Sequence, residues 1–249
     1  MEKLKQVEKE INSECPDVKV RVIQIDLSGN CSMDHYRRIL DETEDLDISV
    51  VIPNAGFAKI GRYDKIPEEV IQQMLDINIY HVGAVTKLFY PRLLARTLKN
   101  PGLHSGILTV SSVASDSPLG YVSIYHATKA WVTYLAISYK EHHFASTYMT
   151  EGLTLEHQRA AMPWSNMVDT LLLKPGLTVS NMPPKHILKF ATPTNLVVQG
   201  TINNLGQYST TYGYWQHELT GALFGAIYES AAAVLPMIAK GMAKEADYK

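Results

Sequence analysis

Cysteine is scarce in this sequence, and the two that occur form no recognisable metal or redox motif. Cys15 and Cys31 are the only cysteines among 249 residues, and neither stands in a Cys-x-x-Cys pair. The nine histidines also form no His-Glu-x-x-His pattern. We therefore expect two free thiols, as in a protein of a reducing intracellular compartment, and no metal site.

An excess of charge of one sign is lacking as well. The formal net charge is −2, whereas a nucleic-acid partner calls for a strongly basic face. The first twelve residues mix acidic and basic side chains and hold no apolar core, which argues against a secretory signal. We expect neither a nucleic-acid partner nor a targeting leader.

Long hydrophobic runs are also few, and the one candidate lies near the C-terminus. The stretch 219–239 is long enough to span a bilayer and carries only one charge, Glu229. Its alanines, glycines and Pro236 make it weakly hydrophobic, and Gly221 and Gly225 permit close helix contact. We expect a packed or surface-lying helix, with peripheral membrane contact as the alternative.

What the sequence does contain is a regular alternation of strand and helix patterns. All but the first of the expected strands are short apolar runs, which is typical of a parallel sheet covered on both faces. A single α/β domain is expected over 1–249, with 143–166 an extended connection and 217–249 a C-terminal helical tail. Strands are expected at 18–27, 46–53, 105–112, 167–176 and 210–215, and helices at 2–14, 32–44, 67–96, 122–142 and 193–204.

Polar and glycine residues follow these strands. Ligands of open parallel sheets bind at the carboxyl ends of the strands, so side chains at those ends are the first candidates for a site. They are Asp26, Asn54, Ala55, Gly56, Ser111, Ser112, Pro175, Gly176 and Ser180.

A tyrosine and a lysine four residues apart supply candidate chemistry. Tyr125 and Lys129 fall on one face of an expected helix. An ammonium at ~4 Å stabilises a phenolate by ~4 kcal/mol at an effective dielectric near 20, before desolvation is subtracted. The tyrosine pKa would then fall, which suits a proton donor to a carbonyl oxygen. Taken alone, the pair is equally consistent with a solvated surface pair of little energetic weight.

An ordered set of motifs runs along the chain. It consists of Asn54-Ala55-Gly56, Asn78, Ser112, Tyr125-x-x-x-Lys129 and Pro175-Gly176, together with the segments LDINIYHV, GILTVSS, SIYHATKAWV and TYGYWQHELTGAL. This set is similar to the short-chain dehydrogenase/reductase family, and resembles most its hydroxysteroid dehydrogenase and very-long-chain 3-oxoacyl-CoA reductase branch. The resemblance covers nearly the whole chain.

The resemblance implies roles for these residues. Tyr125 would be the general acid, Lys129 would lower its pKa and bind the nicotinamide ribose, and Ser112 would hold the substrate carbonyl. Asn78 would keep a helix kink and a relay water. The expected cofactor is NADP(H), with NAD(H) as the alternative. The cofactor-binding residues would be Asp26 at the adenine, Asn54, Ala55, Gly56, Tyr125, Lys129, Pro175, Gly176 and Ser180.

The implied substrate is lipid-like: a ketone or hydroxyl on a fatty acyl thioester or a steroid. By resemblance the protein would associate with the endoplasmic reticulum membrane, with mitochondria as the alternative. One departure stands against this reading, because the family's Thr-Gly-x-x-x-Gly-x-Gly loop is absent. The expected fold is therefore a Rossmann-like doubly wound parallel sheet without its first β-α-β unit.

The missing loop leaves several interpretations open. The sequence could be part of a longer chain, or a partner chain could supply the missing unit. A homodimer could hold the fold together through the helices that carry Asn78 and Tyr125. Alternatively, the protein is a catalytically silent structural subunit of a larger complex, derived from such an enzyme.

Overall fold

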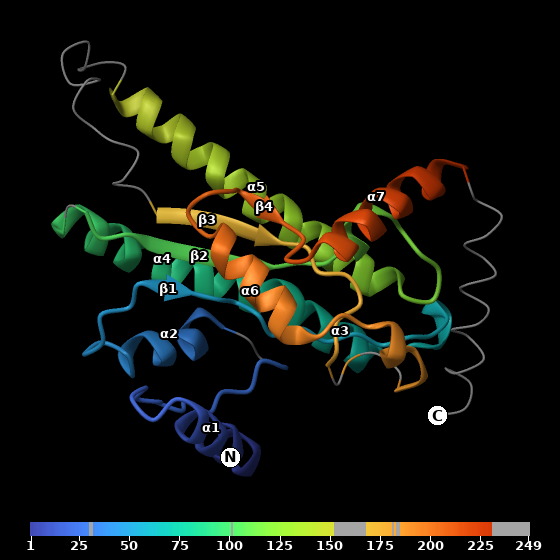
Figure 1. Cartoon of the computed structure of the whole chain (residues 1–249), viewed down its shortest axis with the longest axis horizontal. Helices are drawn as coiled ribbons and strands as arrows, with labels where there is room; N and C mark the ends of the chain where they lie inside the picture. The colour runs from blue at the N-terminus through green and yellow to red at the C-terminus, as the bar shows by residue number, and fades with distance from the viewer. Residues whose placement is uncertain (30–31, 101, 152–167, 181, 183–184, 231–249) are drawn as a thin grey trace.

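Four parallel strands form the sheet at the centre of the computed structural model (Figure 1). The structure describes residues 1–29, 32–100, 102–151, 168–180, 182 and 185–230. The longest pairing joins β2 (Ser105–Val110) to β3 (Val168–Leu173) along all six residues of each strand. The two-residue strands β1 (Val50–Val51) and β4 (Thr210–Thr211) flank them in the order β1-β2-β3-β4.

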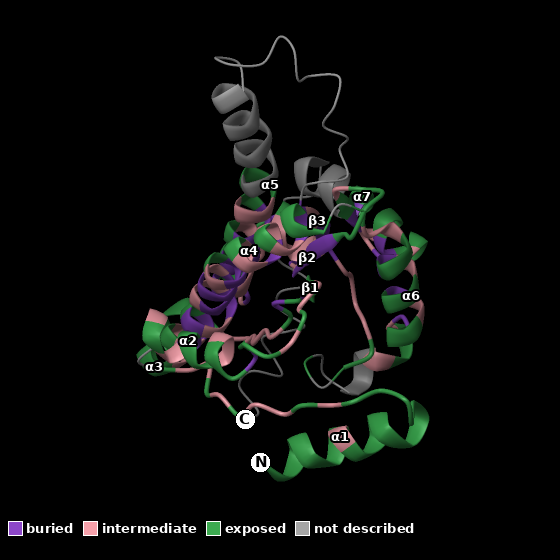
Figure 2. Cartoon of the chain, turned by 90° about the vertical axis from the view of Figure 1, so that its left-hand side faces the viewer, coloured by how far each residue is buried: buried purple, intermediate pink, exposed green. Residues whose placement is uncertain are grey.

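Helices cover both faces of this sheet (Figure 2). On one face, α2 (Met33–Asp41) and α4 (His81–Lys99) pack over β1 and β2 around the buried side chains of Tyr36 and Leu93. On the other face, α6 (Thr194–Asn204) buries Val197 against β2 and β3. This arrangement confirms the Rossmann-like, doubly wound parallel sheet that the sequence predicts.

The strand predicted at 18–27 is wrong. The segment is extended but pairs with no strand among the described residues, and a β-strand needs a neighbour to satisfy its backbone groups. The segment is held to the rest of the protein by side-chain contacts instead. Arg21 forms two hydrogen bonds, of 2.6 and 2.8 Å, to the carboxylate of Asp45, and Ile25 and Leu27 pack against the core beside α2.

The helices begin close to their predicted positions but differ in length. α1 (Glu2–Glu14) matches its prediction, and α5 (Ser123–Glu151) continues past 142 into the stretch 143–166 that we expected to be irregular. Residues 152–166 lie outside the described residues. Three short 3-10 turns, η1 (Tyr63–Lys65), η3 (Val113–Asp116) and η5 (Lys185–Phe190), occur in the connections.

The C-terminal part also departs from expectation. The predicted strand 210–215 is only β4, because Trp215 already opens α7 (Trp215–Ser230). The remainder of the predicted tail, 231–249, is outside the described residues. Within the part that the structure describes, no helix is both long and apolar enough to cross a membrane.

Candidate active site

The carboxyl ends of three strands bring the predicted site residues to one edge of the sheet. Asn54-Ala55-Gly56 follows β1, Ser111 and Ser112 follow β2, and Pro175-Gly176 follows β3. Since parallel strands end at the same edge, these segments lie together there. Two hydrogen bonds join the chain after β2 to the end of β3 and the loop that follows it. The Val113 amide donates to the Pro175 carbonyl at 3.1 Å, and the Ser111 amide donates to the carbonyl of Leu173, the last residue of β3, at 2.8 Å.

Asn78 reaches this edge from an irregular turn of helix. The sequence predicted one helix over 67–96, but α3 (Glu68–Leu75) and α4 are joined by a π-helical turn, η2 (Asp76–Tyr80). The Asn78 side chain is fully buried. Its amide accepts a hydrogen bond from the Phe57 N–H at 2.8 Å and donates to the Phe57 carbonyl at 2.8 Å and to the Thr128 hydroxyl at 3.0 Å. The residue thus ties the loop after β1 to α5.

Tyr125 lies close to Ser112. Ser112 is the N-cap of η3. Its hydroxyl accepts a hydrogen bond from the Ala114 amide at 3.1 Å and donates one to the Pro175 carbonyl at 3.4 Å. Tyr125 lies in the first turn of α5, close enough to Ser112 for the serine hydroxyl to lower its pKa. The two side chains are therefore neighbours at the carboxyl edge of the sheet.

Lys129 lies deeper than Tyr125. Only 3% of it is exposed, and its Nζ donates a 2.9 Å hydrogen bond to the Val110 carbonyl at the end of β2. Nζ also lies 5.8 Å from the centre of the Tyr125 ring. Burial lowers the pKa of Lys129 to about 8, because the charged ammonium loses its hydration there.

The expected lowering of the tyrosine pKa is wrong for this structure. Burial raises the pKa of Tyr125, and the hydrogen bond from Ser112 only partly opposes that shift. The physical reason is that desolvation penalises the phenolate, while the ammonium of Lys129 is directed at the Val110 carbonyl instead of the phenol oxygen.

Gly56 leaves space beside Lys129 and Asn78. A Cβ built at Gly56 would lie 3.5 Å from the Lys129 Nζ, 3.7 Å from the Asn78 Oδ1 and 3.7 Å from the Met182 Cε. The backbone at 56 thus passes close to two polar catalytic candidates without a side chain in between. Glycine is the usual residue where the backbone closely approaches a bound ligand.

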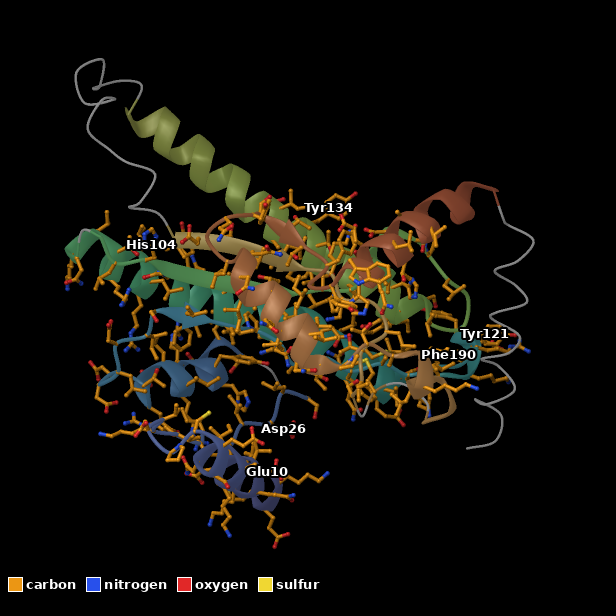
Figure 3. All side chains as sticks on the ribbon, in the orientation of Figure 1. Glu10, Asp26, His104, Tyr121, Tyr134 and Phe190 are labelled. Carbon is orange, nitrogen blue, oxygen red and sulfur yellow. The ribbon has the colours of Figure 1, made fainter. Side chains whose placement is uncertain are left out.

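The remaining predicted cofactor residues lie farther from this cluster or are exposed. Asp26 is exposed and accepts hydrogen bonds from the Ser28 amide and hydroxyl, at 2.9 and 2.8 Å, which lower its pKa. Figure 3 shows it in the N-terminal part of the molecule, on the side of α1. Asn54 and Ser180 are exposed, and the Ser180 hydroxyl accepts from the Met182 amide at 3.3 Å. Ser111 is buried and bonds to the Lys129 carbonyl at 2.8 Å.

Sequence reasoning missed two groups behind Pro175-Gly176. His217, at the start of α7, packs against Gly176, where an added Cβ would come within 2.8 Å of its ring. Its two ring nitrogens each lie 3.3 Å from a backbone carbonyl, of Tyr212 and Leu177. The buried Lys174 forms an ion pair with the exposed Asp116 of η3. Lys174 and Asp116 are 58 residues apart in the sequence, so no periodic pattern could have predicted that they interact.

Metal-ligating groups do not gather in the part of the chain that is described. No cluster of three or more histidine, cysteine, aspartate or glutamate side chains occurs there. Cys15 is an exposed free thiol, and Cys31 lies outside the described residues.

Fold and site together define a Rossmann-like protein with a Ser-Tyr-Lys arrangement at the carboxyl edge of its sheet. The family model for short chain dehydrogenases matches residues 1–147, more than half of the sequence. The chain belongs to the short-chain dehydrogenase/reductase family.

Relatives among curated proteins carry the names of one branch. The very-long-chain 3-oxoacyl-CoA reductase of Mus musculus is 27% identical over 226 residues, which cover 89% of this chain and 63% of the mouse protein. That of Anas platyrhynchos is 28% identical over 240 residues, with 95% and 68% covered. The chain thus spans less than two thirds of the length of the mouse relative.

Solved structures agree on the fold. A 7beta-hydroxysteroid dehydrogenase superposes with a TM-score of 0.66 at 19% identity, covering 97% of this chain and 83% of that one. The short-chain dehydrogenase of Sphingobium yanoikuyae, solved in complex with NADPH, gives a TM-score of 0.61 at 22% identity, covering 90% and 80%.

Proposed function

We propose that this protein is an NADPH-dependent reductase that converts a ketone on a lipid-like substrate to an alcohol. The observation that carries the proposal is the placement of Tyr125 next to Ser112, beside the Lys129 Nζ 5.8 Å from the tyrosine ring centre and the buried Asn78. Two hydroxyls at one point can hold a carbonyl oxygen and protonate it as negative charge develops. No other group of described residues combines these features.

In this mechanism, Ser112 donates a hydrogen bond to the substrate carbonyl, and Tyr125 transfers its phenolic proton to the same oxygen. Bound NADPH would supply the hydride. The raised pKa of Tyr125 keeps the phenol protonated at neutral pH, so it is ready to donate. Once the phenolate forms, a turn of the Lys129 side chain from the Val110 carbonyl toward it would stabilise the charge.

The residues that would hold the cofactor line the carboxyl edge. Gly56 offers a surface without a side chain beside Lys129 and Asn78, which fits the nicotinamide ribose. Pro175-Gly176 would form the floor below the ring. Asn54, Ala55 and Ser180 lie on the loops that follow β1 and β3, and Asp26 would contact adenine. The NADPH complex of the Sphingobium yanoikuyae relative favours NADPH over NADH.

The names of the relatives guide the choice of substrate. A very-long-chain 3-oxoacyl-CoA is the first candidate, and a steroid ketone the second. The resemblance of the motifs to this branch supports a further proposal: a place at the endoplasmic reticulum membrane, with peripheral contact through the C-terminal helix.

The proposal is tested by an assay of long-chain 3-oxoacyl-CoA reduction, in which the loss of NADPH absorbance measures the rate. Tyr125→Phe should lower kcat by about 10²- to 10⁴-fold, because it removes the proton donor and keeps the ring. Tyr134→Phe, an exposed tyrosine on the same helix, is the matched control and should leave kcat unchanged. Equal rates for the two variants would contradict the assignment of Tyr125.

A second candidate function is that of a catalytically silent structural subunit. Native mass spectrometry with and without NADPH separates the two functions, because only the reductase forms a nucleotide adduct. The same spectrum tests a homodimer, which the exposed Trp131, Tyr134 and Ile137 on α5 would stabilise.

A further inference from the structure

Lys174 is a charged residue that lies buried beside the candidate active site. Only 8% of it is exposed, although a lysine is seldom buried unless its ammonium is paired. It directly follows the last residue of β3, and its backbone N–H donates a 2.8 Å hydrogen bond to the Thr211 carbonyl of β4. Its neighbour Pro175 carries the carbonyl that accepts from the Ser112 hydroxyl at 3.4 Å. Lys174 therefore lies between the sheet and the residue that contacts Ser112.

Two side chains from other elements hold the ammonium of Lys174. The carboxylate of Asp116, the last residue of η3, forms an ion pair with it. The ring of Tyr212, just after β4, has its centre 5.6 Å from Nζ, within the range of a cation–π contact. This ring packs directly on α7, because a Cβ added at Gly221 would lie 2.8 Å from it. Lys174 is thus the point at which β3, η3 and the chain after β4 meet.

The short turn η3 is attached to the end of β3 at two points. At its start, the Val113 N–H donates to the Pro175 carbonyl at 3.1 Å, beside the bond from Ser112. At its end, Asp116 pairs with Lys174. A 3-10 turn of four residues has poor internal hydrogen-bond geometry, so contacts to the rest of the fold determine where it lies. The consecutive residues Lys174 and Pro175 therefore fix both ends of the turn that Ser112 caps.

We propose that Lys174 is a positioning residue: through its ion pair with Asp116 it holds η3, and with it the Ser112 hydroxyl, in place for the reaction. The effect on the rate rests on the proposed function, whereas the placement of Ser112 beside Tyr125 does not. Without the ion pair, η3 is attached at its start only. The Ser112 bond to Pro175 is long at 3.4 Å and opposes a displacement weakly. A displacement of about 1 Å at a reacting group can lower a rate by about 100-fold.

Fluorine NMR tests the placement of Ser112 without an assay of activity. In the whole chain, 3-fluorotyrosine replaces Tyr125, so its resonance reports the contact with Ser112. Ser112→Ala gives the resonance position for a lost contact. We expect Lys174→Met and Asp116→Asn to displace the resonance toward that position. The double variant should displace it no further than either single variant, because both residues act through one ion pair.

Two further variants separate the charge of Lys174 from its bulk. Lys174→Arg keeps the cation and should keep the wild-type resonance. Arg38→Met is the matched control, because it removes the cation of the exposed ion pair with Glu42 on α2 and should leave the resonance unchanged. Circular dichroism verifies that each variant is folded. Lys174→Met is the safer of the two pair-breaking changes, because the remaining Asp116 carboxylate is exposed to water.

The rate of the proposed reduction gives the second readout, measured on the same variants without the fluorine label. Lys174→Met, Asp116→Asn and the double variant should each lower kcat by about 10-fold or more, and Lys174→Arg should restore it.

The outcomes distinguish the positioning role from the proposed function. A wild type that reduces no substrate, with the resonance displaced as expected, would refute the proposed function alone. An active wild type whose variants keep its resonance, keep its kcat, or show additive effects of the two substitutions would refute the positioning role alone. A Lys174→Arg resonance displaced as far as that of Lys174→Met would also refute it, because the ion pair would then not be the cause.

Discussion

The three hydrogen bonds of Asn78 predict a large and specific loss of stability on truncation. Asn78→Ala removes the contacts to the Phe57 N–H, the Phe57 carbonyl and the Thr128 hydroxyl, at 2.8, 2.8 and 3.0 Å. Each bond contributes about 1 kcal/mol, and a buried backbone group left without a partner costs a further 1–3 kcal/mol. The structure therefore predicts that the free energy of unfolding falls by about 3 kcal/mol, which displaces a urea midpoint by about 1 M.

Asn100→Ala is the matched control for this measurement. Asn100 follows the last residue of α4, is exposed, and donates a 3.0 Å hydrogen bond to the Arg96 carbonyl. Its loss should change the free energy of unfolding by no more than about 0.5 kcal/mol. Equal urea midpoints for the two variants would refute the reasoning, because they would show that the buried bonds of Asn78 contribute no more than a solvated one.

Further predictions concern a buried charge and two helical glycines. Burial lowers the folded-state pKa of Lys129 from 10.5 to about 8, so between these values the unfolded chain binds more protons. The free energy of unfolding of the wild type, relative to Lys129→Met, should rise by about 3 kcal/mol from pH 8 to 10.5 and stay level below pH 8. A difference that is flat across that window in urea titrations would contradict the burial of the ammonium. Gly200→Ala should lower the melting temperature, because its Cβ would lie 1.9 Å from the Gly213 carbonyl oxygen. Gly83→Ala meets only the Trp131 side chain, at 3.3 Å, and should instead stabilise α4 by up to about 1 kcal/mol; a loss in calorimetry would show that the indole cannot yield.

The sequence predicts the layer architecture because periodicity is a local property. Apolar runs at 105–110 and 168–173 became the two six-residue strands, and α1 begins and ends at its predicted residues. The segment 18–27 alternates equally well, but alternation describes a strand's faces and says nothing about whether a neighbour is present. The segment does not join the sheet because it has no neighbouring strand among the described residues, and a local sequence pattern carries no information about neighbours.

The site divides in the same way. The order of Ser112 and Tyr125 along the chain predicts their meeting, because both follow from where a strand ends and a helix begins. The direction of the Tyr125 pKa shift could not be predicted, since it depends on burial and on the Val110 carbonyl that holds Lys129. His217 and Lys174 were missed because their partners, Leu177 and Asp116, lie 40 and 58 residues away.

The extra residue of the π-helical turn at Asp76–Tyr80 serves the site and not the packing of the core. A π turn accommodates one residue more than an α turn, so the helices before and after it keep the faces of an uninterrupted helix that is one residue shorter. Removing a single residue from this turn would leave Met74 and Val82 directed into the core. It would also rotate Asn78 away from Phe57 and Thr128. The core thus places no demand on the extra residue, and the geometry that it produces is used by the loop after β1 and the helix that carries Tyr125.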